Sequence, residues 1–89
     1  MKREDKRRYI YDFLSNNPCV DCGEIDPTVL SFDHVRGDKI DSVSRMVSSN
    51  RRIELIRDEM AKCEVRCHNC HARKTARDRG WYAWLNDQE

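Results

Sequence analysis

The sequence predicts a small α+β domain, and three observations support that fold class. Two Cys-x-x-Cys pairs, residues 19–22 and 67–70, are separated by 44 residues. Residues 29–35 alternate in a β-rich composition, whereas apolar residues recur at helical spacing over much of the remaining chain. The chain has 89 residues, of which 38% are apolar and 37% charged, so its apolar core alone would give marginal stability. A single domain, residues 1–89, is therefore expected to need a further cross-link.

A basic helix is expected over residues 2–16. Its apolar stripe falls at helical spacing and consists of Tyr9, Ile10, Phe13 and Leu14, while five cations crowd the first two turns. Asn16-Asn17-Pro18 ends the helix, because the residue before a proline is disfavoured in the α region. Cations at a helix N-terminus oppose the helix dipole, so an anionic partner at that end would stabilise the helix.

The middle of the chain is expected to alternate turns, a strand and helices. Residues 19–23 have the form Cys-x-x-Cys-Gly, a tight knuckle in which the glycine relieves the turn. Residues 29–35 form the expected strand, and Arg36-Gly37-Asp38-Lys39 ends it. Residues 41–62 are expected as two helical pieces, with Ser48-Ser49-Asn50 as the break and as the N-cap of the second piece.

The last third is expected to return as an extended segment over residues 63–67. A helix over residues 68–79 then follows, ended by Gly80 at its C′ position. The chain thus divides into an N-terminal basic helix (1–16), a cysteine-containing core (17–77) and an aromatic tail (78–89). The large side chains of that tail are expected to pack in the core or as a lid rather than to stack on bases: Trp81, Tyr82, Trp84 and Leu85.

One structural zinc ion is the expected partner of the four paired cysteines, Cys19, Cys22, Cys67 and Cys70. Zinc prefers four soft ligands in a tetrahedron, and each pair supplies two thiolates from one turn. The odd cysteine count argues against a full disulfide framework, with disulfides or a redox role as the alternatives. Cys63 is left over and is expected to be a small buried apolar residue. Reduced thiols, with no apolar run after Met1 and no transmembrane stretch, predict a cytoplasmic protein.

A zinc site filled by four thiolates has no open position for chemistry, so reactive groups must be sought elsewhere. Asp33 and His34 lie at the end of the expected strand, and His71 directly follows the last paired cysteine. Adjacent strand residues point to opposite sides, so one can bind a metal while the other activates a water. A carboxylate and an imidazole leave most of the coordination of Mg²⁺ or Mn²⁺ to water and phosphate oxygens. With a histidine as general base, this set predicts phosphodiester hydrolysis.

Three motifs together resemble the HNH endonuclease superfamily: Cys-x-x-Cys, then Phe32-Asp33-His34-Val35, then Cys-His-Asn-Cys-His-x-x-Lys-Thr ending at Thr75. The resemblance covers residues 17–77 and implies a ββα-metal (His-Me finger) fold with an attached zinc clamp. It implies Asp33 and His71 as ligands of a catalytic Mg²⁺ or Mn²⁺, His34 as the general base, and ends with a 5′-phosphate and a 3′-hydroxyl. Small members are frequent in phages and prophages, which implies a bacterial or phage-infected cell, and some are linked to genome packaging, which implies a packaging partner.

The sequence departs from the family pattern in the loop between the two strands. Members usually carry a bracing asparagine shortly before the third clamp cysteine, where this chain has Lys62 and Cys63. Either Lys62 braces the loop by donating to a carbonyl, or activity is reduced. Asn69 lies inside the second knuckle and is not taken for that asparagine. A further metal-binding histidine of some members is replaced by Thr75.

Charge distribution gives the DNA-binding expectation modest support. The net charge is +1, but residues 1–8, 34–52 and 71–79 are each +3, around residues 9–33 at −5. Three basic segments around an acidic one suit a phosphate-binding surface near a cation, although ordinary solvated charge explains them equally well. Contacts to double-stranded DNA are expected from Arg36, Arg73, Lys74, Thr75 and Arg77.

The sequence therefore favours a metal-dependent HNH-type endonuclease that contacts DNA and no membrane. Cleavage of both strands would favour a homodimer. A zinc-stabilised DNA-binding or adaptor module on the same fold, catalytically weak because the bracing asparagine is absent, is the alternative. A zinc-ribbon module for protein interaction is a third reading, and it predicts no affinity for DNA.

Overall fold

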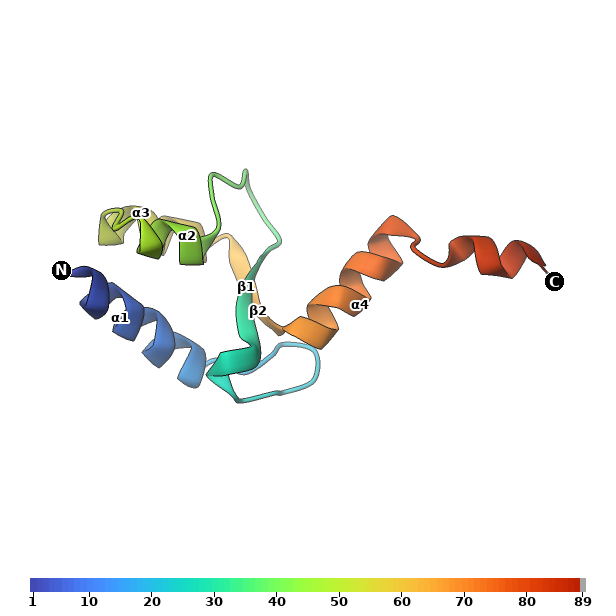
Figure 1. Ribbon diagram of the computed structural model, residues 1–89, viewed down its shortest axis with the longest axis horizontal. Helices are drawn as coiled ribbons and strands as arrows, with labels where there is room; N and C mark the ends of the chain where they lie inside the picture. The colour runs from blue at the N-terminus through green and yellow to red at the C-terminus, as the bar shows by residue number, and fades with distance from the viewer. Residues whose placement is uncertain (89) are drawn as a thin grey trace.

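The computed structural model describes residues 1–88, with side chains as far as Leu85; the last residue of the predicted tail, Glu89, lies outside the described residues. The elements in chain order are α1 (Arg3–Ser15), η1 (Pro27–Val29), β1 (Leu30–His34), α2 (Val43–Ser48), α3 (Ile53–Met60), β2 (Cys63–Cys67), α4 (His68–Arg79) and η2 (Ala83–Gln88). The predicted α+β class is confirmed, and the sheet has two antiparallel strands. Figure 1 shows the hairpin at the centre, α1–α3 on one side, and α4 with η2 extending away on the other.

The strand register separates the hairpin into an apolar and a polar face. Phe32 lies opposite Val65, and Asp33 lies opposite Glu64. Because opposed residues of an antiparallel pair point to the same side and neighbours alternate, Leu30, Phe32 and His34 share one face while Ser31 and Asp33 share the other. The two adjacent residues singled out in the sequence therefore leave β1 on opposite sides.

Two clusters of buried residues stabilise the domain. The clamp cluster lies around the paired cysteines and consists of Leu14, Cys19, Leu30, Val65, Cys67 and Cys70. The helical cluster lies between α2 and α3 and consists of Val43, Met46, Val47, Ile56 and Met60. Ile10, Phe13 and Phe32 pack against both, with the rings of Phe13 and Phe32 centred 5.7 Å apart. These three side chains join the two clusters into one core.

The basic start of α1 includes one cation that is part of the fold. Lys6 is buried, and its Nζ donates to the carbonyl of Arg51 at 2.6 Å and to Oδ1 of Asn50 at 2.9 Å. Asn50 has a positive φ of 55° and turns the chain between α2 and α3. Lys6 therefore fastens α1 to that turn, whereas the other cations at the start of the helix are exposed.

The predicted N-cap of the second helical piece is wrong. The N-cap residue of α3 is Arg52, whose side chain makes no cap hydrogen bond, and Asn50 serves the preceding turn. The side-chain cap belongs to α2, where Oγ of Ser42 accepts from the backbone N–H of Arg45 at 3.2 Å.

The C-terminal part corrects a second expectation. Gly80 ends α4 in the left-handed conformation, φ 62°, as the sequence predicted. The expected packing of the aromatic tail is wrong, because four large side chains are exposed: Trp81, Tyr82, Trp84 and Leu85. Within residues 1–88, none of the helices combines the length and apolar character that crossing a membrane requires.

Candidate metal centre and active site

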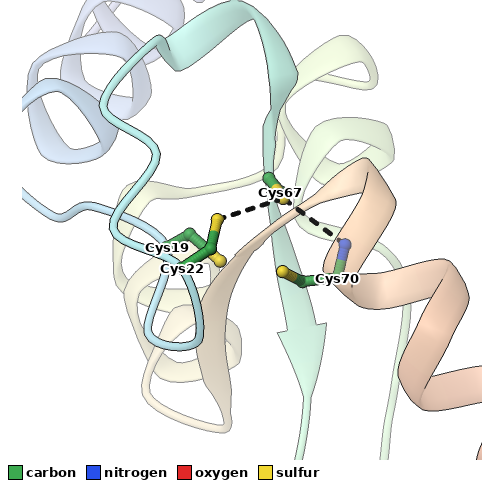
Figure 2. A group of neighbouring side chains, drawn as sticks. All are labelled: Cys19, Cys22, Cys67 and Cys70. Atoms are coloured by element: carbon green, nitrogen blue, oxygen red, sulfur yellow. Dashed lines mark hydrogen bonds between the residues drawn. The ribbon is translucent and has the colours of Figure 1, made fainter.

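The four paired cysteines converge on one point. Their sulfur atoms all lie within 4.8 Å of one another. Figure 2 shows the four side chains gathered between the first knuckle and the start of α4. In a tetrahedral site with Zn–S bonds of about 2.3 Å, neighbouring sulfurs are about 3.8 Å apart. The sulfurs of Cys22 and Cys67 are 3.7 Å apart, and all four thiols are free of disulfides. The cluster can therefore hold a structural metal ion such as zinc.

Local backbone bonds shape both knuckles around the cluster. The N–H of Gly23 donates to the carbonyl of Cys19 at 2.9 Å, and Gly23 takes the positive φ of 80° that this turn requires. The N–H of Val20 donates to the carbonyl of Val65 at 3.0 Å, which fastens the first knuckle to β2. Cys67 is the N-cap residue of α4, and its sulfur accepts from the N–H of Cys70 at 3.4 Å.

The polar surroundings favour a thiolate at one of these cysteines. Burial raises the pKa of Cys19, but hydrogen bonds from the backbone at Cys67, Cys22 and Asp21 outweigh burial and lower that pKa to about 6. A thiolate is the form in which cysteine binds a metal, so Cys19 is prepared to act as a ligand.

Cys63 is not one of the four converging cysteines, as predicted. Its sulfur donates to the carbonyl of Glu59 at 3.3 Å, and its side chain packs against the helical cluster. The side chain is partly buried, whereas full burial was expected. Burial, together with the carboxylates of Glu59 and Asp33, raises the pKa of Cys63 to about 11. The thiol is thus protonated and poorly nucleophilic at neutral pH.

Asp33 and His71 come together on the polar face of the hairpin. Oδ1 of Asp33 lies 3.6 Å from Nε2 of His71, which is the fourth residue of α4 and directly follows Cys70. Asp33 is buried, whereas the His71 side chain is 42% exposed. Lys74, one helical turn further along α4, brings its Nζ to 3.5 Å from Oδ2 of Asp33. The pair thus has a closed side at the strand and an open side toward solvent.

Arg66 is a site residue that the sequence analysis missed. Its guanidinium contacts three carboxylates, at 2.8 Å for Asp33, 2.7 Å for Asp21 and 3.0 Å for Glu64. The hydrogen bond and charge of Arg66 lower the pKa of Asp21. The signal that could have revealed Arg66 is the strand period, because Arg66 alternates with Val65 and Cys67 and so must share the polar face with Asp33.

His34 lies on the other face of β1 and contacts a second residue that was missed, Glu59 of α3. Nε2 of His34 is 2.8 Å from Oε2 of Glu59, and Glu59 is almost fully buried. Burial raises the pKa of Glu59, but hydrogen bonds from Lys62, the N–H of Ile40 and His34 outweigh burial and lower it to about 2. Glu59 is therefore a carboxylate that can only accept, so Nε2 of His34 carries the proton in this hydrogen bond, and in a neutral imidazole Nδ1 then has the free lone pair.

The hypothesis that Lys62 braces the loop between the strands is confirmed. Its Nζ donates to the carbonyl of Asp38 at 2.7 Å and lies 2.9 Å from Oε1 of Glu59. The backbone carbonyl of Lys62 accepts from the N–H of Val35 at 2.9 Å. Arg36, expected to contact DNA, donates from its guanidinium to the carbonyl of Ala61 at 2.6 Å and so also holds this loop.

The remaining expected DNA contacts lie along α4. Arg73 and Arg77 are exposed, and Lys74 and Thr75 are partly buried. A surface hollow beside the clamp is lined by Asp21, Cys70, Arg73, Lys74 and Arg77. Three of its five lining residues are cations, so the hollow suits an anionic group.

Of the three expected catalytic side chains, the structure brings Asp33 and His71 together on one face of β1. On the other face it pairs His34 with Glu59. Comparison with known proteins gives no match to a family model, a curated protein or a solved structure. An assignment of function must therefore be argued from the geometry of these residues.

Proposed function

We propose that the chain is a metal-dependent endonuclease of the HNH type, which hydrolyses DNA phosphodiester bonds on a ββα-metal domain. One observation supports the proposal above all others. A hairpin and a helix that contains one of the clamp cysteines bring the carboxylate of Asp33 to 3.6 Å from the imidazole of His71, next to Lys74, which lines a cationic hollow.

The donor set fits a hard divalent cation. Two ligands at right angles around Mg²⁺ are about 3 Å apart, because each lies about 2.1 Å from the ion. Oδ1 of Asp33 and Nε2 of His71, at 3.6 Å, need only a small adjustment to reach that spacing. Mg²⁺ or Mn²⁺ held there would supply Lewis-acid stabilisation of the phosphate and the leaving oxygen. The open side of His71 leaves room for water and phosphate oxygens.

His34 would act as the general base through Nδ1. Glu59 holds the other ring nitrogen at 2.8 Å and thereby fixes both the tautomer and the direction of the ring. A phosphate bound at the end of β1, where the strand no longer separates His34 from Asp33, would lie between a water on Nδ1 and the ion held by Asp33 and His71. The water would then attack phosphorus from the side opposite to the leaving oxygen, as an in-line displacement requires.

The cations of α4 would hold the DNA backbone. Lys74 lies on the same helical face as His71, and Arg73 and Arg77 line the hollow next to it. Phosphate contacts of this kind orient a duplex without reading its sequence. They give a role to the four cations of α4, which stand against one acidic residue in that helix.

A second candidate is a zinc-stabilised DNA-binding or adaptor module with weak or no catalysis. The observation in its favour is that Arg66 and Lys74 both approach Oδ2 of Asp33, at 2.8 and 3.5 Å. These cations compete with a divalent ion for the carboxylate and so lower the affinity of the site for that ion. Oδ1 stays available, so we rank this candidate second.

A plasmid nicking assay separates the two candidates. Zinc-loaded protein is incubated with supercoiled DNA in Mg²⁺, in Mn²⁺ and without added divalent ion. We expect relaxed plasmid only with the added ion, and a loss of at least about 100-fold in rate for His34→Ala. His68→Ala, which removes an exposed histidine of the same chain, is the matched control and should cleave normally. Equal cleavage by His34→Ala and His68→Ala would refute the assigned base.

A further inference from the structure

The C-terminal aromatic side chains remain unexplained by the proposed active site. Trp81 is 48% exposed, Tyr82 67%, Trp84 57% and Leu85 47%. Large aromatic side chains are costly to leave in water, and a group of them on a surface indicates a binding site. Trp81 and Trp84 are the only two tryptophans of the chain.

The turn at Gly80 attaches this aromatic segment directly to the basic helix. The N–H of Trp81 donates to the carbonyl of Ala76 at 2.9 Å, and that of Ala83 to the carbonyl of Gly80 at 3.2 Å. Figure 1 shows α4 and η2 extending away from the rest of the domain, which has a longest dimension of 57 Å. The segment thus follows α4 after a turn and lies apart from the core.

The positive charge of α4, beside the aromatic segment, indicates which kind of partner the segment binds. Within α4, one acidic residue, Asp78, stands against four cations: Arg73, Lys74, Arg77 and Arg79. In a symmetric pairing with a second copy, these cations would face their own equivalents and repel. A polyanion that also presents flat apolar rings satisfies both halves of the surface, and nucleic acid is such a partner.

We propose that residues 81–85 form a base-stacking arm that binds unpaired nucleotides while α4 holds the adjoining phosphates. The inference rests on the proposed function for the identity of the nucleic acid. Base faces inside a duplex are already stacked, so the arm needs a single-stranded, frayed or branched segment next to the cleaved bond. The preferred substrate is therefore DNA with a local unpaired region.

The length of α4 predicts where that region lies. Gly80 lies nine positions after His71, a rise of about 14 Å along a helix. At about 3.4 Å per nucleotide, the unpaired bases would lie roughly four nucleotides from the cleaved bond.

Tryptophan fluorescence tests the arm directly, because both tryptophans belong to it. Full-length, zinc-loaded His34→Ala protein, which should not cut, is titrated with three DNA probes of roughly 12 nucleotides per strand, within the site sizes known for single-strand binding. The probes are a single strand, the same strand with abasic positions, and its blunt duplex. We expect saturable quenching by the single strand, with an affinity about tenfold above that for the abasic strand.

Variants assign the quenching to stacking. Trp81→Leu and Trp84→Leu each leave one reporter and should weaken single-strand binding about tenfold. Tyr11→Leu, which removes an exposed aromatic side chain from α1, is the matched control and should bind normally. Equal binding of the single and the abasic strand would overturn the proposal. So would a fluorescence change that follows protein concentration without DNA, because it would assign the surface to a second copy.

The plasmid assay keeps the two proposals separate. Quenching by single strands in a protein that never cuts plasmid would retain the arm and remove the nuclease. Cutting by a protein whose tryptophans do not respond to single strands would retain the nuclease and remove the arm.

Discussion

The clamp cluster and the helical cluster each bury five or six residues, but different forces hold them. Half of the clamp cluster consists of cysteines. Their thiolates repel one another unless a metal ion binds them together. The helical cluster consists of aliphatic and methionine side chains, and the buried Lys6 and Glu59 secure its edges through hydrogen bonds. One half of the domain therefore depends on coordination and the other on packing.

Each half of the domain positions one part of the proposed active site. The clamp places His71, because Cys70 precedes it in the first turn of α4. The helical cluster places His34, because Glu59 projects from α3 to hold the ring. The comparison teaches that metal loss and core truncation should damage the site through different residues.

Zinc removal should have the largest effect. Structural zinc contributes on the order of 10 kcal/mol to folding, which is comparable to the whole stability of a small domain. We expect a chelator to unfold the chain, as measured by loss of helical circular dichroism, and metal analysis to give one zinc per folded chain. A folded preparation without any metal would contradict this account of the clamp.

Thiol counting sharpens the same test. In the zinc-loaded protein the four clamp sulfurs should be protected and Cys63 should react slowly, because its pKa is raised to about 11. The raised pKa means that the fold favours the neutral thiol, so alkylation should accelerate as the pH rises toward 11. Cys63→Ser should remove this reaction and retain zinc, whereas Cys70→Ser should lose zinc.

Truncation in the helical cluster should have the second largest effect. Ile56 is 0% exposed, and Ile56→Ala should lower the free energy of unfolding by about 4 kcal/mol through lost burial and a cavity. Zinc should stay bound in the fraction that remains folded. The same substitution at Ile25, which is 73% exposed, should change stability by less than about 0.5 kcal/mol. Urea unfolding of both variants measures the difference, and equal losses would contradict the assigned core.

Glu59→Gln should have the smallest of the three effects on stability, about 2 kcal/mol, through weaker hydrogen bonds to Lys62 and His34. The pKa of Glu59 is about 2 in the fold, against an ordinary value of 4.5. The carboxylate therefore contributes fully above pH 4.5, and its contribution is lost as the pH falls from 4.5 toward 2. The stability gap between wild type and Glu59→Gln should stay constant from pH 8 to about 5 in urea titrations. A gap that closes within that range would contradict the lowered pKa.

Local signals in the sequence were sufficient for the elements that surround the site. The helix expected over residues 68–79 has those bounds in the structure, because a cysteine cap begins it and Gly80 ends it. The strand expected over residues 29–35 occupies Leu30–His34, and its two-residue period correctly separates Asp33 from His34. The clamp followed from ligand type and spacing alone.

Partners distant in the sequence could not be predicted in the same way. Lys6 meets Arg51 across 45 positions, and His34 meets Glu59 across 25. Nothing in the neighbouring residues distinguishes these charges from solvated ones, since their burial depends on how α1 and α3 pack. The prediction for the aromatic tail was wrong for the opposite reason. Its composition suits a core, but no element of residues 1–88 covers it.

Manganese binding measured by electron paramagnetic resonance tests the central claim most directly, because it reports on the site without requiring cleavage. Zinc-loaded wild-type protein should bind one Mn²⁺ per chain, and His71→Ala should bind it at least about tenfold more weakly. His68→Ala, three residues away, should match the wild type. No Mn²⁺ binding by the wild type, or equal binding by His71→Ala, would show that Asp33 and His71 do not form a metal site.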